Sequence, residues 1–371
     1  GDVSSMMSKK NFAQKMKMAF IGVSVAALPF FPCNNNNNNN NSQTGKNSEI
    51  VHKMIQIEED IDTIPYNIPL SIKTLDSLID NSRSYIEKKE FYNKKDLEKI
   101  SKKVYSETAK LKGIDKEGDF CYRSALIFLA IGNANQMPFE IMDLGEHLFI
   151  QYTPFNNEKI NIETTTGEIQ NNEKYSDNYY LSEFALQKEG IKKKIYFKNL
   201  TEKELLSLAY TQTATINLKK YGKKNNAEKF LGLRKNIIKY CKKAIKLDSN
   251  FRSAYVILGA AESLEEGFPV SYKGQKKALS SFEKAQKMHP SADVYCLIGN
   301  CYSELGQRKK AIENYTNAIN LIYEIRKEFN KPKSYLKNLE ARCLFGKAQM
   351  YEILDDKKSA EEDKKKLNKL L

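Results

Sequence analysis

Three residues of this 371-residue chain have the types that catalysis by an activated thiol requires. Cys121 offers a thiol, His147 an imidazole and Glu163 a carboxylate. A thiol becomes a strong nucleophile when an imidazole takes its proton, and a carboxylate orients the imidazole and stabilises its charged form. Taken singly, they would be a packing cysteine, a structural histidine and a surface charge. Together they form a candidate catalytic set, which requires elements that bring them into contact.

Cys121 lies near the start of a predicted helix. The sequence "DFCYRSALIFLAIGNANQMPF" contains a long apolar run, Gly113 and Gly118 bracket the turn before it, and Asp119 is the expected N-cap. Cys121 would then lie in the first turn, where free backbone amides and the helix dipole favour the thiolate form of a cysteine. The backbone amide of Cys121 is one generic candidate for an oxyanion donor.

The two other residues lie where apolar and polar side chains alternate. This alternation predicts two strands joined by a polar loop, the second strand reaching Thr165. If the strands pair as an antiparallel hairpin in which position 151 faces position 159, His147 faces Glu163. Their Cβ atoms would then lie about 5 Å apart on one face of the sheet.

The residues around this set resemble the bacterial transglutaminase-like family of the papain-like superfamily. The resemblance rests on "FCYRSALIFLAIGNANQMP", "GEHLFIQY" and "INIETTTGE". It implies a domain of helices and an antiparallel sheet over residues 50–198, which performs acyl transfer or amide hydrolysis through a thioester on Cys121. His147 and Glu163 would complete the triad. Many relatives have Asp in place of Glu163 and Trp in place of Ile162.

The C-terminal part of the chain is predicted to be helical and repetitive. Within residues 292–325, Tyr295, Gly299 and Ala318 recur at the spacing of a 34-residue helix–turn–helix repeat. This segment resembles a tetratricopeptide repeat, and "SAYVILGAAESLEEG" with "KALSSFEKAQKMHP" resembles a second copy. We therefore predict an α+β chain whose N-terminal cysteine domain is followed by an all-α repeat array over 199–371. The groove of such an array binds a peptide or a protein.

Local signals mark the two ends of this array. Thr201 and Glu204 form a capping box at its first helix, and the degenerate, Lys-rich pair at 334–370 is typical of a capping repeat. Four cysteines fall on the array helices and are interpreted as small apolar packing residues: Cys241, Cys296, Cys301 and Cys343. Their spacing matches no metal site, so we predict no metal, nucleotide or other cofactor.

The N-terminus has the pattern of a processed leader. Four lysines precede the short apolar run at 18–31, and Cys33 follows it. We interpret residues 1–33 as a signal peptide or lipoprotein leader and 34–49 as an Asn-rich disordered linker. The protein would then be secreted or belong to the cell envelope, with lipid anchoring at Cys33. A cytoplasmic protein with a disordered leader is the alternative.

The composition excludes several classes of protein. Hydrophobic residues make up 41% of the chain and charged residues 29%, which excludes a polytopic membrane protein and a fully disordered chain. The net charge is +14, of which residues 34–371 hold +11. Lysine clusters such as Lys192–Lys194 are interleaved with acidic residues and are interpreted as solvated helix faces. No nucleic-acid-binding motif is present, so no nucleic-acid partner is expected.

Two functions remain open from the sequence. The first is a cysteine acyl transferase or amide hydrolase that acts on a peptide or protein through Cys121, His147 and Glu163, with the array binding protein. The second is a non-catalytic interaction or scaffold protein of the cell envelope, in which the triad is a relic and both domains bind peptide or protein.

Overall fold

The computed structural model describes the larger part of the chain: residues 47–59, 70–89, 92–111, 120–144, 147–153, 159–170, 176, 179–180, 197–221, 227–264, 272–329 and 334–370. The predicted leader at 1–33, with Cys33, lies outside these residues, as do the predicted turn glycines and Asp119. The predicted linker, 34–49, also lies outside them up to residue 46, and its last three residues belong to the helix α2 (Asn47–Glu59).

The described residues form two compact units. The first holds those between 47 and 213 together with Lys243–Phe251, and the second holds those of Ala214–Lys242 and Arg252–Leu371. Among the residues that the structure describes, no helix is both long and apolar enough to cross a membrane.

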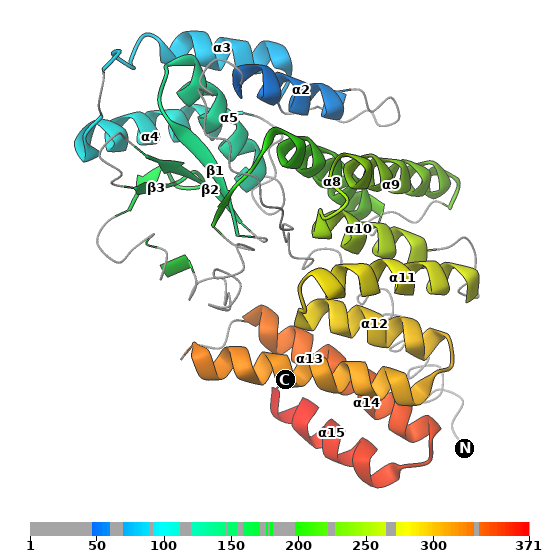
Figure 1. The fold of residues 1–371 in the computed structure, drawn as a ribbon. Helices are drawn as coiled ribbons and strands as arrows, with labels where there is room; N and C mark the ends of the chain where they lie inside the picture. Colours follow the sequence, from blue (N-terminus) through cyan, green and yellow to red (C-terminus); the bar gives the residue numbers. More distant parts are fainter. Residues whose placement is uncertain are drawn as a thin grey trace. The chain divides into compact units, whose positions relative to one another are not determined.

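Four helices lead to the candidate site in the first unit: α2, α3 (Ile72–Ser82), α4 (Lys94–Thr108) and α5 (Phe120–Ala134). Helix α5 is buried at nearly every position because α2, α3 and α4 contact it, as do two strands of the sheet. Its apolar sequence therefore forms the centre of the unit (Figure 1).

The sheet of the first unit is antiparallel. Its strands lie in the order β4-β3-β2-β1-β5. They are β1 (Phe139–Asp143), β2 (Leu148–Tyr152), β3 (Ile160–Glu163), β4 (Glu168–Ile169) and β5 (Lys198–Asn199). Helix α5 packs closely on β1, since a Cβ atom at Gly132 would lie 2.3 Å from the Phe139 ring. The small residue thus sets the distance between helix and sheet.

The predicted register of the hairpin is wrong by two residues. Gln151 pairs with Asn161 instead of residue 159, so Glu163 lies opposite Phe149 instead of His147. The side-chain pattern of a strand repeats every two residues, so alternation cannot distinguish registers that differ by two. The same periodicity keeps side chains on their face of the sheet. Glu163 and His147 are therefore diagonal neighbours on one face.

The second predicted strand is also shorter than expected. It ends at Glu163, whose carbonyl oxygen accepts hydrogen bonds from the backbone N–H groups of Thr166 (3.3 Å) and Gly167 (2.8 Å). Gly167 has a φ of 71°, a conformation that glycine adopts without steric cost. Thr165 thus lies in a tight turn between β3 and β4, not in a strand.

The chain from residue 202 onward is helical in the described residues. Its helices are α8 (Glu202–Tyr221), α9 (Ala227–Leu247), α10 (Arg252–Ser263), α11 (Tyr272–Met288), α12 (Ala292–Glu304), α13 (Arg308–Glu328), α14 (Ser334–Ile353) and α15 (Lys357–Leu370). The capping box before α8 is confirmed. Glu204 Oε2 accepts from Thr201 N (2.9 Å) and Thr201 Oγ1 (2.7 Å), and Glu204 N donates to Thr201 Oγ1 (3.4 Å).

Successive helices of the second unit pack against one another through glycines. A Cβ atom at Gly259 of α10 would lie 2.7 Å from the Phe282 ring of α11. A Cβ atom at Gly299 of α12 would lie 2.7 Å from the Tyr315 ring of α13. The same glycine–aromatic contact in two successive helix pairs is the packing expected of a helical repeat.

Candidate functional site

The structure places Cys121 in the first turn of α5. The helix begins at Phe120, so the thiol lies one residue inside its N-terminal end. Cys121 is half-buried, whereas the other cysteines of the described part of the chain are buried. A partly accessible thiol at a helix start is the setting in which cysteine is reactive.

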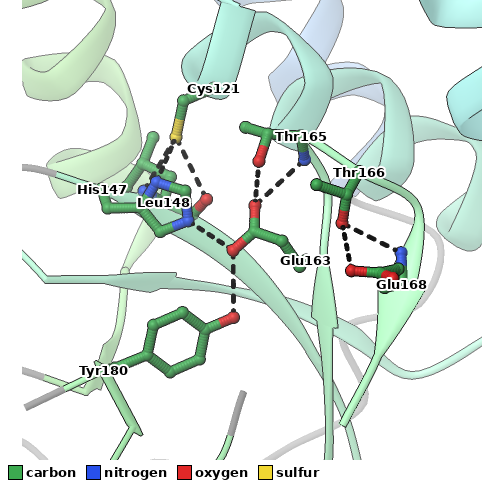
Figure 2. Close-up of polar contacts among 8 residues, drawn as sticks. All are labelled: Cys121, His147, Leu148, Glu163, Thr165, Thr166, Glu168 and Tyr180. Carbon is green, nitrogen blue, oxygen red and sulfur yellow. Dashed lines mark hydrogen bonds and ion pairs between the residues drawn. The ribbon is translucent and has the colours of Figure 1, made fainter. Parts of the chain in front are cut away.

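The Cys121 sulfur lies against the first residues of β2. It is 3.2 Å from His147 Nδ1, and it accepts a hydrogen bond from the Leu148 N–H at 3.0 Å (Figure 2). As a thiol it has an acceptor in the Leu148 carbonyl oxygen at 3.2 Å. His147 directly precedes β2, and its own carbonyl oxygen accepts from Leu144 N at 2.9 Å. This hydrogen bond between Leu144 and His147 helps to hold the imidazole beside the sulfur.

The second ring nitrogen of His147 binds Glu163. His147 Nε2 lies 2.7 Å from Glu163 Oε2, and the two side chains are 10% and 6% exposed. Because an ionised carboxylate only accepts hydrogen bonds, Nε2 is the donor in this contact. The structure thus brings Cys121, His147 and Glu163 into one chain of contacts, although the predicted strand register was wrong.

Both oxygens of Glu163 are satisfied by more than one donor. Oε1 accepts from the backbone N–H of Thr165 (3.0 Å) and from its hydroxyl. Oε2 accepts from His147 Nε2 and from the Tyr180 hydroxyl at 3.2 Å (Figure 2). A buried carboxylate without such partners would be strongly destabilising, so these donors allow the charge to be kept.

The pKa values of the buried pair move in opposite directions. Burial alone would lower the pKa of His147, but the negative charges of Cys121 and Glu163, and hydrogen bonds to both, raise it well above its ordinary value. Burial alone would raise the pKa of Glu163, but the charge of His147 and hydrogen bonds from His147 and Thr165 lower it. Both shifts favour an imidazolium paired with a carboxylate at neutral pH.

Sequence reasoning missed three contributors to this site. Leu148 acts through its backbone, and Thr165 binds Glu163 only because the chain turns after β3. Gly167, a turn residue, was the signal that could have located that turn. Tyr180 reaches the site from a separate segment, and no spacing in the sequence indicates it.

The other four cysteines of the described chain are buried in the helices that follow residue 226. Burial raises the pKa of Cys301 to about 12 and raises that of Cys241 further still. Among the residues that the structure describes, no group of three or more His, Cys, Asp or Glu side chains is placed to hold a metal ion. Among the described cysteines, Cys121 is thus the half-buried one, and its sulfur lies beside a histidine.

Comparison with known proteins identifies the repeat. The family model of the tetratricopeptide repeat matches residues 292–324, which cover α12 and most of α13. No curated protein matches the chain. A solved structure titled "Crystal structure of MamA" is 22% identical and covers 47% of this chain and 95% of its own, with a TM-score of 0.30. Tetratricopeptide repeats bind protein partners, so the family match supports a protein-binding repeat array.

Proposed function

We propose that this protein is a transglutaminase-like cysteine hydrolase or acyl transferase that acts on an amide of a peptide or protein. The observation that carries the proposal is the continuous contact from the Cys121 sulfur through both ring nitrogens of His147 to Glu163. A nucleophile, a base and an orienting acid within hydrogen-bond distance form the arrangement that activates a thiol.

In the proposed reaction, the Cys121 thiolate attacks the carbonyl carbon of the amide. His147 Nδ1 gives its proton to the departing nitrogen, the C–N bond breaks, and the acyl group remains on sulfur as a thioester. Water or an amine then attacks the thioester carbon, His147 takes the proton of this nucleophile, and the C–S bond breaks. The thiolate and the imidazolium are thereby restored.

Glu163 would act without touching the substrate. Its charge keeps His147 protonated beside the sulfur, as the raised pKa of His147 indicates. Its position also directs Nδ1 toward the thiol, because Nε2 is already bound to the carboxylate. Such a group orients the imidazole and stabilises its charged form.

The repeat array would bind the protein partner or substrate. We also propose that residues 1–33 direct the chain to the cell envelope, with lipid attachment at Cys33. Intact-mass analysis of the protein from its native cells tests this placement. A chain lacking the leader, or carrying lipid on Cys33, supports it, and an unprocessed chain in the cytosol contradicts it.

Alkylation of the thiol by iodoacetamide, measured against pH, tests the catalytic proposal. Labelling of Cys121 should remain fast at pH 6, where less than about 1% of ordinary thiols are ionised. Cys121→Ala should lose this labelling, and His147→Ala should move its pH dependence toward that of an ordinary thiol. If the wild-type thiol reacts only above about pH 8, His147 and Glu163 do not activate Cys121. The protein is then better described as a non-catalytic interaction protein.

A further inference from the structure

A tyrosine from outside the predicted triad contacts the triad's acid. The Tyr180 hydroxyl donates to Glu163 Oε2 at 3.2 Å, and the same oxygen accepts from His147 Nε2 at 2.7 Å (Figure 2). The Tyr180 side chain is fully buried. A tyrosine hydroxyl is normally buried only where it has a hydrogen-bond partner, and here that partner is the buried carboxylate.

The ring of Tyr180 is fixed on the same face of the sheet as His147. It stacks on Phe149 of β2, with the ring centroids 4.4 Å apart and the planes 14° from parallel. The His147 ring lies 6.0 Å away, and the Phe197 ring approaches edge-on at 6.4 Å. The Tyr180 N–H donates to the Ser176 carbonyl oxygen at 3.0 Å, which holds the backbone behind the ring.

In this arrangement the Tyr180 hydroxyl stabilises the charged form of Glu163. Hydrogen bonds to the charged form of a carboxyl group favour that form, and Glu163 needs them because its burial disfavours the charge. The other oxygen, Oε1, is held by Thr165, so the donor from Tyr180 also opposes rotation of the carboxylate away from Nε2. The aromatic stack and the hydrogen bond thus act on the atom that binds His147.

We propose that Tyr180 is a positioning residue of the triad, which keeps Glu163 ionised and directed at His147. The proposal rests on the function proposed above for its relevance to catalysis. Tyr180 itself would touch neither substrate nor sulfur. Its effect would reach the reaction only through Glu163 and the imidazole.

The experiment compares two tyrosine-to-phenylalanine variants of the full chain. Tyr180→Phe removes the hydroxyl and keeps the stacked ring. Tyr85→Phe is the matched control, because the Tyr85 hydroxyl also donates to a carboxylate, Glu107 Oε2, at 3.1 Å. The titration of Glu163 is followed by ¹³C NMR of its carboxyl carbon, and the resonance is assigned by its loss in Glu163→Gln.

The Glu163 midpoint should rise by about one pH unit in Tyr180→Phe, the size expected for one lost hydrogen bond to a charged group. It should stay unchanged in Tyr85→Phe. A hydroxyl that contributes only to the stability of the fold would lower the melting temperature on removal and leave the Glu163 midpoint in place, and that result would overturn the proposal.

A second variant tests the same contact in the opposite direction. Fluorotyrosine at position 180 keeps the ring and makes its hydroxyl a stronger donor, so the Glu163 midpoint should fall. An unchanged midpoint would again count against the proposal. Both readouts are independent of Cys121 chemistry. An unreactive thiol with a shifted carboxyl midpoint would refute the proposed function alone, and an activated thiol with an unmoved midpoint would refute only the role of Tyr180.

Discussion

Glu163 is buried and still has a lowered pKa, because its neighbours donate the hydrogen bonds and provide the positive charge that stabilise the carboxylate. Thr165 covers one carboxylate oxygen, and His147 with Tyr180 covers the other. At the scale of residues, the acid of the site is therefore held in place by three neighbouring residues. Burial alone would lower the pKa of His147, and the charges of Cys121 and Glu163 raise it.

Removing the charge of Glu163 should lower the pKa of His147. Glu163→Gln keeps the shape of the side chain, so the domain should still fold. With less imidazolium beside the sulfur, iodoacetamide labelling of Cys121 at pH 6.5 should fall about tenfold, which corresponds to about 1.4 kcal/mol of lost stabilisation. NMR titration of the His147 ring measures the pKa change directly.

The raised pKa of His147 also makes the stability of the fold depend on pH. A histidine whose folded pKa is raised stabilises the fold fully below its unfolded value of about 6.5, and this contribution is lost as pH rises through the folded pKa. The pH dependence of unfolding in that alkaline range should flatten in Glu163→Gln. Glu107 is a carboxylate outside the triad, so Glu107→Gln should leave the pH dependence of unfolding in this range unchanged. An unaltered profile in Glu163→Gln would mean that the ion pair is not formed.

At the scale of elements, local signals in the sequence located the helix of Cys121 and the strands β2 and β3, but they did not determine how the strands pair. The start of α5 near Cys121 and the capping box at Thr201 could be predicted because each depends on neighbouring residues. The β2–β3 register could not, because alternation repeats every two residues. Tyr180 could not be found either, since its approach to Glu163 is a tertiary contact between separate segments.

The glycine contacts of the helical repeat give a prediction at this scale. Gly299→Leu should destabilise the second unit by about 1–3 kcal/mol, because the added side chain meets the Tyr315 ring. Gly232→Ala is the control. Gly232 lies exposed in α9 with no atom within 4 Å of an added Cβ, so it should gain about 0.5–1 kcal/mol from helix propensity. Urea unfolding of both variants measures the difference, and equal stabilities would contradict the close packing of α12 on α13.

At the scale of the whole molecule, the positive charge is concentrated in one part of the sequence. Residues 34–226 contain 27 Lys and Arg and 27 Asp and Glu, whereas residues 227–371 contain 29 and 18. The net charge of +11 outside the leader thus equals that of residues 227–371, which contain the helices α9 to α15. Helix α11 is an example, with five lysines, all exposed, and one glutamate. The electrostatic potential of this positive charge attracts acidic partners, and salt weakens the attraction.

The full chain should therefore bind an acidic polypeptide in a salt-dependent way. With poly-L-glutamate as the probe, binding should be measurable at low ionic strength and lost at about 0.5 M salt, where screening is strong. Replacement of both Lys276 and Lys277 on α11 by Glu should weaken the binding of poly-L-glutamate several-fold. The same replacement of Lys94 and Lys95 on α4 should have little effect. Equal losses from both pairs would show that the charge acts without preference for the repeat helices.

The central claim is that Cys121 forms a thioester with the help of His147. Mass spectrometry of the full chain after brief incubation with p-nitrophenyl acetate at neutral pH tests it most directly. The account predicts a single acetyl group that maps to Cys121, is released by hydroxylamine, forms more slowly in His147→Ala and is absent from Cys121→Ala. Acetyl groups on surface lysines alone, with Cys121 unmodified in the wild-type protein, would contradict it.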